Sequence, residues 1–199
     1  MVVIDANILL LLLRPGTPVP VGANGVPIER PRDRIDKFVN DIDATGSKII
    51  IPTPALSEAL VHAGAAASQQ IVEYLQRYSV FRIEPFDARA AIELAAMTRG
   101  AIAKGSKKAG SIATWAKLKF DRQIVAIAKV CGATEIYSDD VDLQTTARAS
   151  NINVLGLADM PLPADSPQLD FLSGLSAAKP ETGDTGVGKQ ASDDPQPKE

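Results

Sequence analysis

Three carboxylates crowd into the stretch IYSDDVDL, residues 136 to 143. Asp139, Asp140 and Asp142 follow a short apolar run, and their negative charges repel one another unless a proton or a cation intervenes. The stretch is therefore either a solvated acidic turn or one wall of a site that binds cations. Which of these two interpretations holds depends on the residues that the fold brings next to this stretch.

Apolar runs of strand length alternate with segments of helical periodicity along the body of the chain. The pattern predicts strands at 2–4, 48–52, 79–84, 134–137 and 152–156. It predicts helices at 33–44, 54–76 with a break near Gly64, 87–103, 119–131 and 140–148. Thr53, before Pro54, and Asp87 are the predicted helix caps. Strand alternating with helix predicts an α/β fold, with a parallel sheet covered on both faces.

Polar side chains follow two of these strands, at the end where an open parallel sheet binds its ligands. Asp5 and Asn7 come after the first strand, and Ser138 with the three aspartates comes after the fourth. Two further acids are predicted at helix starts. Glu58 lies in the second turn of the helix opened by Thr53, and Asp121 precedes an apolar helix face.

Each of these acids also has a purely structural interpretation. Asp5, Asp121 and Asp140 could cap the helices that follow them, and Glu58 could be a solvated helix position. As a set they favour a metal site, because carboxylate oxygens are hard ligands that suit Mg²⁺. An ion held there could activate water and stabilise charge on the leaving oxygen of a phosphodiester. His62, on the same helix as Glu58, is interpreted as a structural or surface residue.

Four segments together resemble the PIN-domain nucleases, including the VapC-type toxins of bacterial toxin–antitoxin systems. They are VVIDANILL at 2–10, PALSEAL at 54–60, FDRQIVAIAKVCGATEIYSDD at 120–140 and INVLGL at 152–157. Their order and spacing carry the resemblance, which covers residues 1 to 157 apart from 14–32. Asp142 is followed here by Leu143, where members of the family often have Phe.

The resemblance implies a five-stranded parallel sheet of order 3-2-1-4-5 and a ribonuclease that uses Mg²⁺ or Mn²⁺ to hydrolyse RNA. It also implies a toxin restrained by an antitoxin protein, and a homodimer. The family positions that hold metal and catalyse fall on four acids: Asp5, Glu58, Asp121 and Asp140. Asn7, Ser138 and Asp142 fall on supporting positions around them. Asp139, between the matched positions, is predicted to face solvent.

A basic stretch precedes Asp121, since no acidic residue occurs between Leu94 and Phe120. We predict contact with RNA phosphates through Lys107, Lys108, Lys117 and Lys119, although a solvated helix end and loop would have the same composition. The segment 103–115, AKGSKKAGSIATW, is predicted to be a flexible loop. Trp115 could stack on an unpaired base or pack in a core or dimer interface.

The sequence predicts one nuclease domain at 1–157, with a Pro/Gly-rich insertion at 14–32 and an acidic tail at 158–199. Prolines and glycines exclude regular structure in the insertion, which could overhang the site, cover a partner groove or be inert. The tail is poor in residues that could pack, so disorder is predicted from about residue 175, after a possible docking segment at 167–175.

The apolar start of the chain is interrupted by Asp5 and Asn7 and is too short for a membrane span. The single cysteine, Cys131, excludes an internal disulfide. These features predict a cytoplasmic protein that does not associate with a membrane. Two alternatives to a nuclease stay open: a catalytically silent PIN scaffold that binds RNA or protein, and a receiver-type α/β protein with Asp5 as phosphoryl acceptor.

Overall fold

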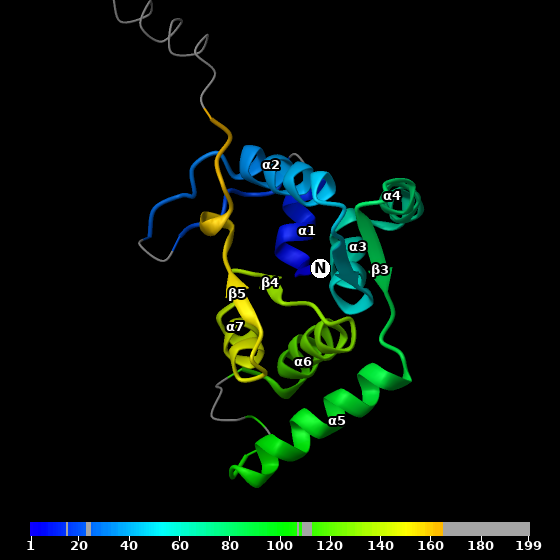
Figure 1. Ribbon diagram of the computed structural model, residues 1–199, viewed down its shortest axis with the longest axis vertical. Coiled ribbons are helices and arrows are strands. Elements are labelled where there is room, and N and C mark those ends of the chain that lie inside the picture. Colours follow the sequence, from blue (N-terminus) through cyan, green and yellow to red (C-terminus); the bar gives the residue numbers. More distant parts are fainter. Residues whose placement is uncertain (15, 23–24, 107, 109–112, 165–199) are drawn as a thin grey trace, which may run out of the picture. The chain divides into compact units, whose positions relative to one another are not determined.

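A computed structural model describes residues 1–14, 16–22, 25–106, 108 and 113–164 of the chain (Figure 1). The contacts divide the chain into one unit of Met1–Pro163 and a second of Ala164–Glu199. The first unit holds every element described below. The disorder predicted from about residue 175, the docking segment at 167–175 and Lys107 lie outside the described residues.

The five predicted strands form one parallel sheet. They are β1 (Val2–Ile4), β2 (Ile49–Pro52), β3 (Phe81–Glu84), β4 (Glu135–Tyr137) and β5 (Asn153–Leu155). Their spatial order is β3-β2-β1-β4-β5, as predicted, with Val3 of β1 beside Ile50 of β2 and Ile136 of β4. A receiver-type sheet has the order 2-1-3-4-5. The topology therefore removes the receiver alternative.

Seven α-helices and one short 3-10 helix connect and follow the strands in the described part of the chain. They are α1 (Ala6–Leu13), α2 (Pro31–Ala44), α3 (Thr53–Ala63), α4 (Ala65–Arg77), α5 (Ala88–Ala103), α6 (Trp115–Val130), α7 (Val141–Arg148) and η1 (Leu157–Asp159). The predicted break between α3 and α4 falls on Gly64, whose φ of +83° favours glycine. None of the helices among these residues has the length and apolar character that crossing a bilayer requires.

Of three predictions about helix starts, two differ from the structure and one is confirmed. α6 begins at Trp115, four residues earlier than predicted, because the hydroxyl of Thr114 accepts the Lys117 N–H at 3.2 Å and caps it. The prediction of a Thr53 cap is wrong. Thr53 lies inside α3, and its hydroxyl accepts the Phe86 N–H at 3.1 Å instead. Asp87 does cap α5, through the Ala90 N–H at 2.9 Å.

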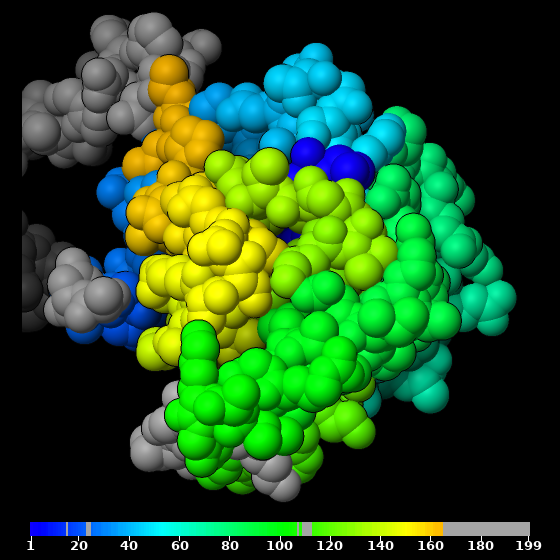
Figure 2. Space-filling model, turned by 60° about the horizontal axis from the view of Figure 1, so that its bottom comes forward, coloured from blue at the N-terminus to red at the C-terminus, as the bar shows by residue number. Residues whose placement is uncertain are grey.

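Alternation of side chains along the strands divides the core between the two faces of the sheet. Val2 and Ile4 pack with residues of α1 to α4, whereas Val3 packs with residues of α5, α6 and α7. In Figure 1 the first group of helices lies above the second. α5 lies over α6, and Figure 2 shows it in green across the lower part of one face, beside α7 and β5 in yellow.

The insertion at 14–32 contains more structure than its composition suggests. Val21 and Pro27 form an isolated antiparallel bridge, and the Ile28 N–H donates to the carbonyl of Pro20 at 2.9 Å. The side chain of Ile28 is buried in the core beside Ile35 of α2. The described residues of this segment form no helix or strand before Pro31, so the prediction fails only at its end, where α2 begins. The buried isoleucine anchors the segment.

Asp139 does not face solvent as predicted. Its side chain is half-buried, and its Oδ1 accepts the N–H of Leu157 at 3.1 Å, which ties the turn after β4 to η1. A Cβ atom on Gly156 would lie 2.5 Å from this oxygen. Glycine at 156 is therefore required by close approach and not by its backbone conformation.

We predict opposite effects on stability for two Gly→Ala substitutions. Gly156→Ala should lower the free energy of unfolding by about 1–2 kcal/mol, because the new methyl group displaces Asp139 from its hydrogen bond. Gly100→Ala should raise it by up to about 1 kcal/mol, because Gly100 lies within α5 with open space around it. Urea denaturation of the two variants and the wild type measures both effects. Equal stability of the Gly156 variant and the wild type would contradict the proposed close approach.

Candidate functional site

The strand order reverses between β1 and β4, and the acidic residues lie directly beyond the carboxyl ends of these two strands. Asp5 follows β1 and donates its backbone N–H to the carbonyl of Tyr137 at 3.2 Å. Ser138 and Asp140 follow β4. A topological switch point in an open sheet leaves a crevice for ligands, so the fold positions these groups where chemistry is expected.

A cavity of about 500 Å³ opens at this point. All four acids predicted to hold metal line it, together with apolar side chains. The lining consists of Asp5, Ala6, Asn7, Ser57, Glu58, Val61, Lys117, Phe120, Asp121, Ile124, Asp140 and Leu143. Of the described residues of the insertion at 14–32, none lines this cavity.

Asp5 caps α1, as one of its two interpretations predicted, and its side chain also lines the cavity. Its Oδ1 caps α1 by accepting the Ile8 N–H at 2.9 Å, and its Oδ2 accepts the hydroxyl of Ser138. The residue is only 3% exposed. Its pKa is raised from 3.8 to about 7, mainly by burial and also by the charges of Asp139 and Asp140, against the effect of these two hydrogen bonds.

Asp140 is linked to Asp5 through a buried serine. The backbone N–H of Asp140 donates to the hydroxyl oxygen of Ser138 at 3.0 Å, and this hydroxyl donates in turn to Asp5. The Oδ1 of Asp140 caps α7 by accepting the N–H groups of Asp142 and Leu143 at 2.9 and 3.1 Å. Ser138 is fully buried. One hydroxyl thus holds the ends of β1 and β4 in a fixed relation.

Asp121 comes from α6 and lies within the helix, as its seventh residue. Its interpretation as a helix cap is therefore wrong, and so is its predicted place at the helix start. The residue is 7% exposed. Burial raises its pKa from 3.8 to about 6, Lys117 lowers it, and the neighbouring charge of Asp140 raises it.

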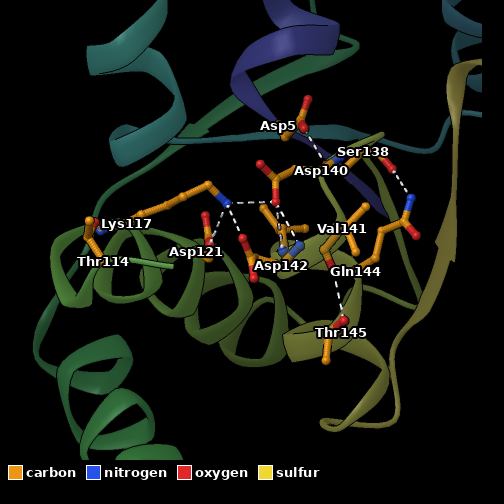
Figure 3. A network of polar contacts seen from close by, with 11 residues as sticks. Asp5, Thr114, Lys117, Asp121, Ser138, Asp140, Val141, Asp142, Gln144 and Thr145 are labelled. Atoms are coloured by element: carbon orange, nitrogen blue, oxygen red, sulfur yellow. Dashed lines mark hydrogen bonds and ion pairs between the residues drawn. The ribbon is translucent and has the colours of Figure 1, made fainter. Parts of the chain in front are cut away.

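The ammonium of Lys117 lies among three of the carboxylates (Figure 3). Its Nζ is 2.9 Å from Oδ1 of Asp140, 2.9 Å from Oδ2 of Asp142 and 3.4 Å from Oδ2 of Asp121. Partial burial would lower the pKa of Lys117, but the hydrogen bonds to Asp140 and Asp142 outweigh it and the pKa lies above 10.5. The prediction from the sequence that this lysine contacts RNA did not include its contact with the acids.

A sequence signal for this contact exists. Lys117 and Asp121 are four residues apart, which is the spacing of an ion pair on a helix. The signal was hidden because the predicted helix began at residue 119, after the lysine. Gln144 was also missed: its Nε2 donates to the carbonyl of Ser138 at 2.9 Å and supports the turn after β4.

The other predicted residues lie at the edge of the cavity or outside it. Glu58 and Asn7 are exposed on the lining, and within the described residues neither side chain forms a hydrogen bond or ion pair with the aspartates. Lys119 is exposed and Lys108 is half-buried. Trp115 is half-buried, with the guanidinium carbon of Arg122 5.4 Å from the centre of its ring.

The donor types suit a hard divalent cation, whereas the present arrangement is held by the lysine. Carboxylate oxygens of four acids line one cavity, and burial and mutual repulsion raise the pKa of Asp5 and Asp121. Among the described residues, however, no three His, Cys, Asp or Glu side chains surround one point closely enough to hold an ion as they stand. The chemistry fits Mg²⁺ or Mn²⁺, and binding requires the acids to move off Lys117.

Neither a protein-family model nor a curated protein matches this sequence. Among solved structures the chain is similar to FitAB bound to an IR36 DNA fragment, with a TM-score of 0.53 and 18% identity over 81% of this chain and 98% of that one. It is also similar to VapBC2 of Rickettsia felis bound to a DNA fragment from their promoter. Here the TM-score is 0.51 and the identity 16%, over 78% of this chain and 98% of that one.

The chain has a PIN-like fold. The predicted fold class is thereby confirmed, including the order of the strands. At 16–18% identity the likeness concerns the fold, so the chemistry has to be argued from the side chains at the switch point of the PIN-like sheet.

The raised pKa of Asp5 predicts that stability falls as pH rises. In the folded chain this pKa is about 7, whereas the unfolded carboxyl titrates near 3.8. Between these values the folded state keeps a proton that the unfolded state has lost. The free energy of unfolding should then decrease by on the order of 1 kcal/mol per pH unit between about pH 4 and pH 7. Thermal unfolding in a chelator measures the slope.

Asp5→Asn should flatten this slope, leaving the smaller contribution of Asp121, whose pKa is about 6. An asparagine can still cap α1, so the fold is expected to survive. Asp87→Asn is the matched control, because Asp87 is also a helix cap but hydrogen bonds lower its pKa. A slope that is the same in the wild type and in Asp5→Asn would contradict the assignment.

Proposed function

We propose that this chain is an endoribonuclease that uses Mg²⁺ or Mn²⁺ to hydrolyse RNA phosphodiester bonds. The observation that carries the proposal is the convergence of four acids on one cavity. Asp5, Glu58, Asp121 and Asp140 come from four separate segments, and all of them line the cavity at the switch point. Carboxylates of separate caps and solvated helix positions have no reason to share one cavity.

Asp5, Asp121 and Asp140 would hold the metal, with Glu58 as a further ligand or as the base that accepts a proton from water. A divalent ion bound to such groups supplies a nucleophilic water and neutralises charge on the leaving oxygen. Ser138 fixes Asp5 and Asp140 relative to each other through its hydroxyl. Asn7, exposed on the lining, is suited to orient water or substrate.

RNA is the proposed substrate because the PIN-domain motifs accompany basic residues near the cavity. Lys119 belongs to the first two turns of α6, the helix that carries Asp121, and Lys108 precedes that helix in the chain. Their side chains would contact phosphates of the bound RNA, which makes binding sensitive to salt. Trp115, next to Arg122, offers a half-buried ring for an unpaired base.

The proposed biological role is that of a toxin restrained by an antitoxin protein, acting as a homodimer. The motifs that resemble VapC-type toxins support this role, and so does the fold shared with VapBC2. A silent scaffold is the second candidate, and one observation favours it. Lys117 neutralises Asp140 and Asp142 without any metal, so the acids could be a permanent ion-pair network.

Cleavage of a mixed RNA pool in Mn²⁺ or Mg²⁺ tests the ribonuclease directly. Asp5→Asn and Asp140→Asn should each lower the rate by at least about 100-fold, because each removes a negatively charged ligand while keeping a residue that can cap a helix. Asp142→Asn should weaken cleavage less, because Asp142 contacts Lys117 but does not line the cavity.

Asp139→Asn is the matched control for this experiment. Asp139 is the immediate neighbour of Asp140, but its carboxylate is directed to the Leu157 N–H and does not line the cavity. Asparagine can accept the same hydrogen bond, so cleavage should stay within about twofold of the wild type. RNA cleavage that persists in both Asp5→Asn and Asp140→Asn would contradict the assignment of the site. Absence of cleavage by the wild type would favour the silent scaffold.

The toxin role makes a separate prediction in living bacteria. Induced production of the wild-type chain should arrest growth, and Asp140→Asn, produced to the same level, should not, because arrest requires RNA hydrolysis. Colony counts after induction measure the difference, and Asp139→Asn is again the matched control. Unimpaired growth with an active wild-type nuclease would leave the ribonuclease intact and reject the toxin role.

A further inference from the structure

Lys117 places a single positive charge at the centre of the acid cluster formed by Asp121, Asp140 and Asp142. A lysine ammonium has three N–H donors, and here three carboxylates from α6 and α7 lie within 3.4 Å of it. Figure 3 shows the side chain extended from α6 with its nitrogen end among the acids. Two of the three carboxylates belong to the set that would hold metal.

The lysine and a divalent cation would therefore compete for the same oxygens. Asp140 Oδ1 is already bonded to Lys117 and to two backbone N–H groups of α7. No group of acids in the described part of the chain is arranged to hold an ion as it stands. The point on which Asp121, Asp140 and Asp142 converge is occupied by the Lys117 ammonium.

Burial does not hold the Lys117 side chain in the acid cluster. The residue lies in the first turn of α6, on the lining of the cavity, and 40% of its side chain is exposed. Exposed lysine side chains exchange conformations readily, and ion pairs of this exposure are weak individually. A bound ion could thus replace the ammonium without a change in the helix, and the released lysine would stay at the mouth of the cavity.

We propose that Lys117 is a built-in counter-ion that occupies the acid cluster before the metal does and turns to a phosphate of the substrate when the metal displaces it. The inference rests on the proposed function, because it names a role for Lys117 at the same site. It makes Lys117 a positioning residue with two states: it holds Asp121, Asp140 and Asp142 together in the metal-free protein and is available to RNA in the loaded one.

The proposal predicts that removal of the lysine charge strengthens metal binding. A neighbouring charge at such distances changes the affinity of a carboxylate for a proton by about 10- to 1,000-fold. We therefore expect Lys117→Met to bind Mn²⁺ at least about tenfold more tightly than the wild type. A residue that merely supported the site would have the opposite effect, since its loss would weaken binding.

Isothermal titration of the full-length chain with Mn²⁺, without RNA, provides the test. Lys119→Met is the matched control: it removes the same charge from the same helix, but Lys119 is exposed and does not line the cavity. Its Mn²⁺ affinity should stay within about twofold of the wild type, whereas its affinity for RNA should fall. Lys117→Gln replaces Lys117→Met if the methionine variant does not fold, as judged by circular dichroism.

The outcomes separate this inference from the proposed function. Tighter binding by the Lys117 variant, or binding by that variant alone, supports the counter-ion. Equal or weaker binding with a wild type that binds Mn²⁺ overturns the counter-ion and leaves the metal site standing. No binding by any variant overturns the metal site, and the counter-ion with it. Mn²⁺ should also raise the unfolding temperature of Lys117→Met more than that of the wild type, which gives a second readout.

Discussion

Mutual repulsion among carboxylates at the switch point is the constraint that shapes this part of the protein. The fold brings Asp5, Asp121 and Asp140 to one cavity, and their charges would separate them if nothing opposed it. Three devices oppose it: the buried hydroxyl of Ser138, the N–H groups of the helices that two of the acids cap, and the ammonium of Lys117. The first two devices fix the positions of Asp5 and Asp140, whereas Lys117 draws Asp121, Asp140 and Asp142 toward its own charge.

The helix caps show how one carboxylate can serve the fold and still line the cavity. Asp5 uses one oxygen for the first turn of α1 and the other for Ser138, so its position is set by β1, α1 and β4 together. Asp140 uses only its Oδ1 for α7 and for Lys117. A short turn from strand to helix thus holds each carboxylate at the cavity with little conformational freedom. In the sequence, capping a helix and binding a metal were alternative interpretations of these acids. Because both residues cap helices and still line the cavity, the two interpretations do not exclude each other.

Much of this arrangement could be predicted from the residues alone. Alternating apolar runs predicted all five strands, because strands depend on local pattern, whereas the order of the strands was implied by the resemblance to PIN-domain nucleases. Asp139 could not be placed in this way. Its environment depends on Gly156 and Leu157, which lie in the next strand–turn unit and approach it only after β4 and β5 have paired.

Lys117 shows where prediction from the sequence failed and why. Its contact with Asp121 is local and was available from the four-residue spacing, but only to a helix that begins before residue 117. The helix begins there because Thr114 caps it, a signal surrounded by small and basic residues that predict a loop. Its contacts with Asp140 and Asp142 cross from α6 to α7 and follow from packing. The predicted helix start was four residues too late. For this reason Lys117 was predicted to contact RNA, whereas in the structure it neutralises the acid cluster.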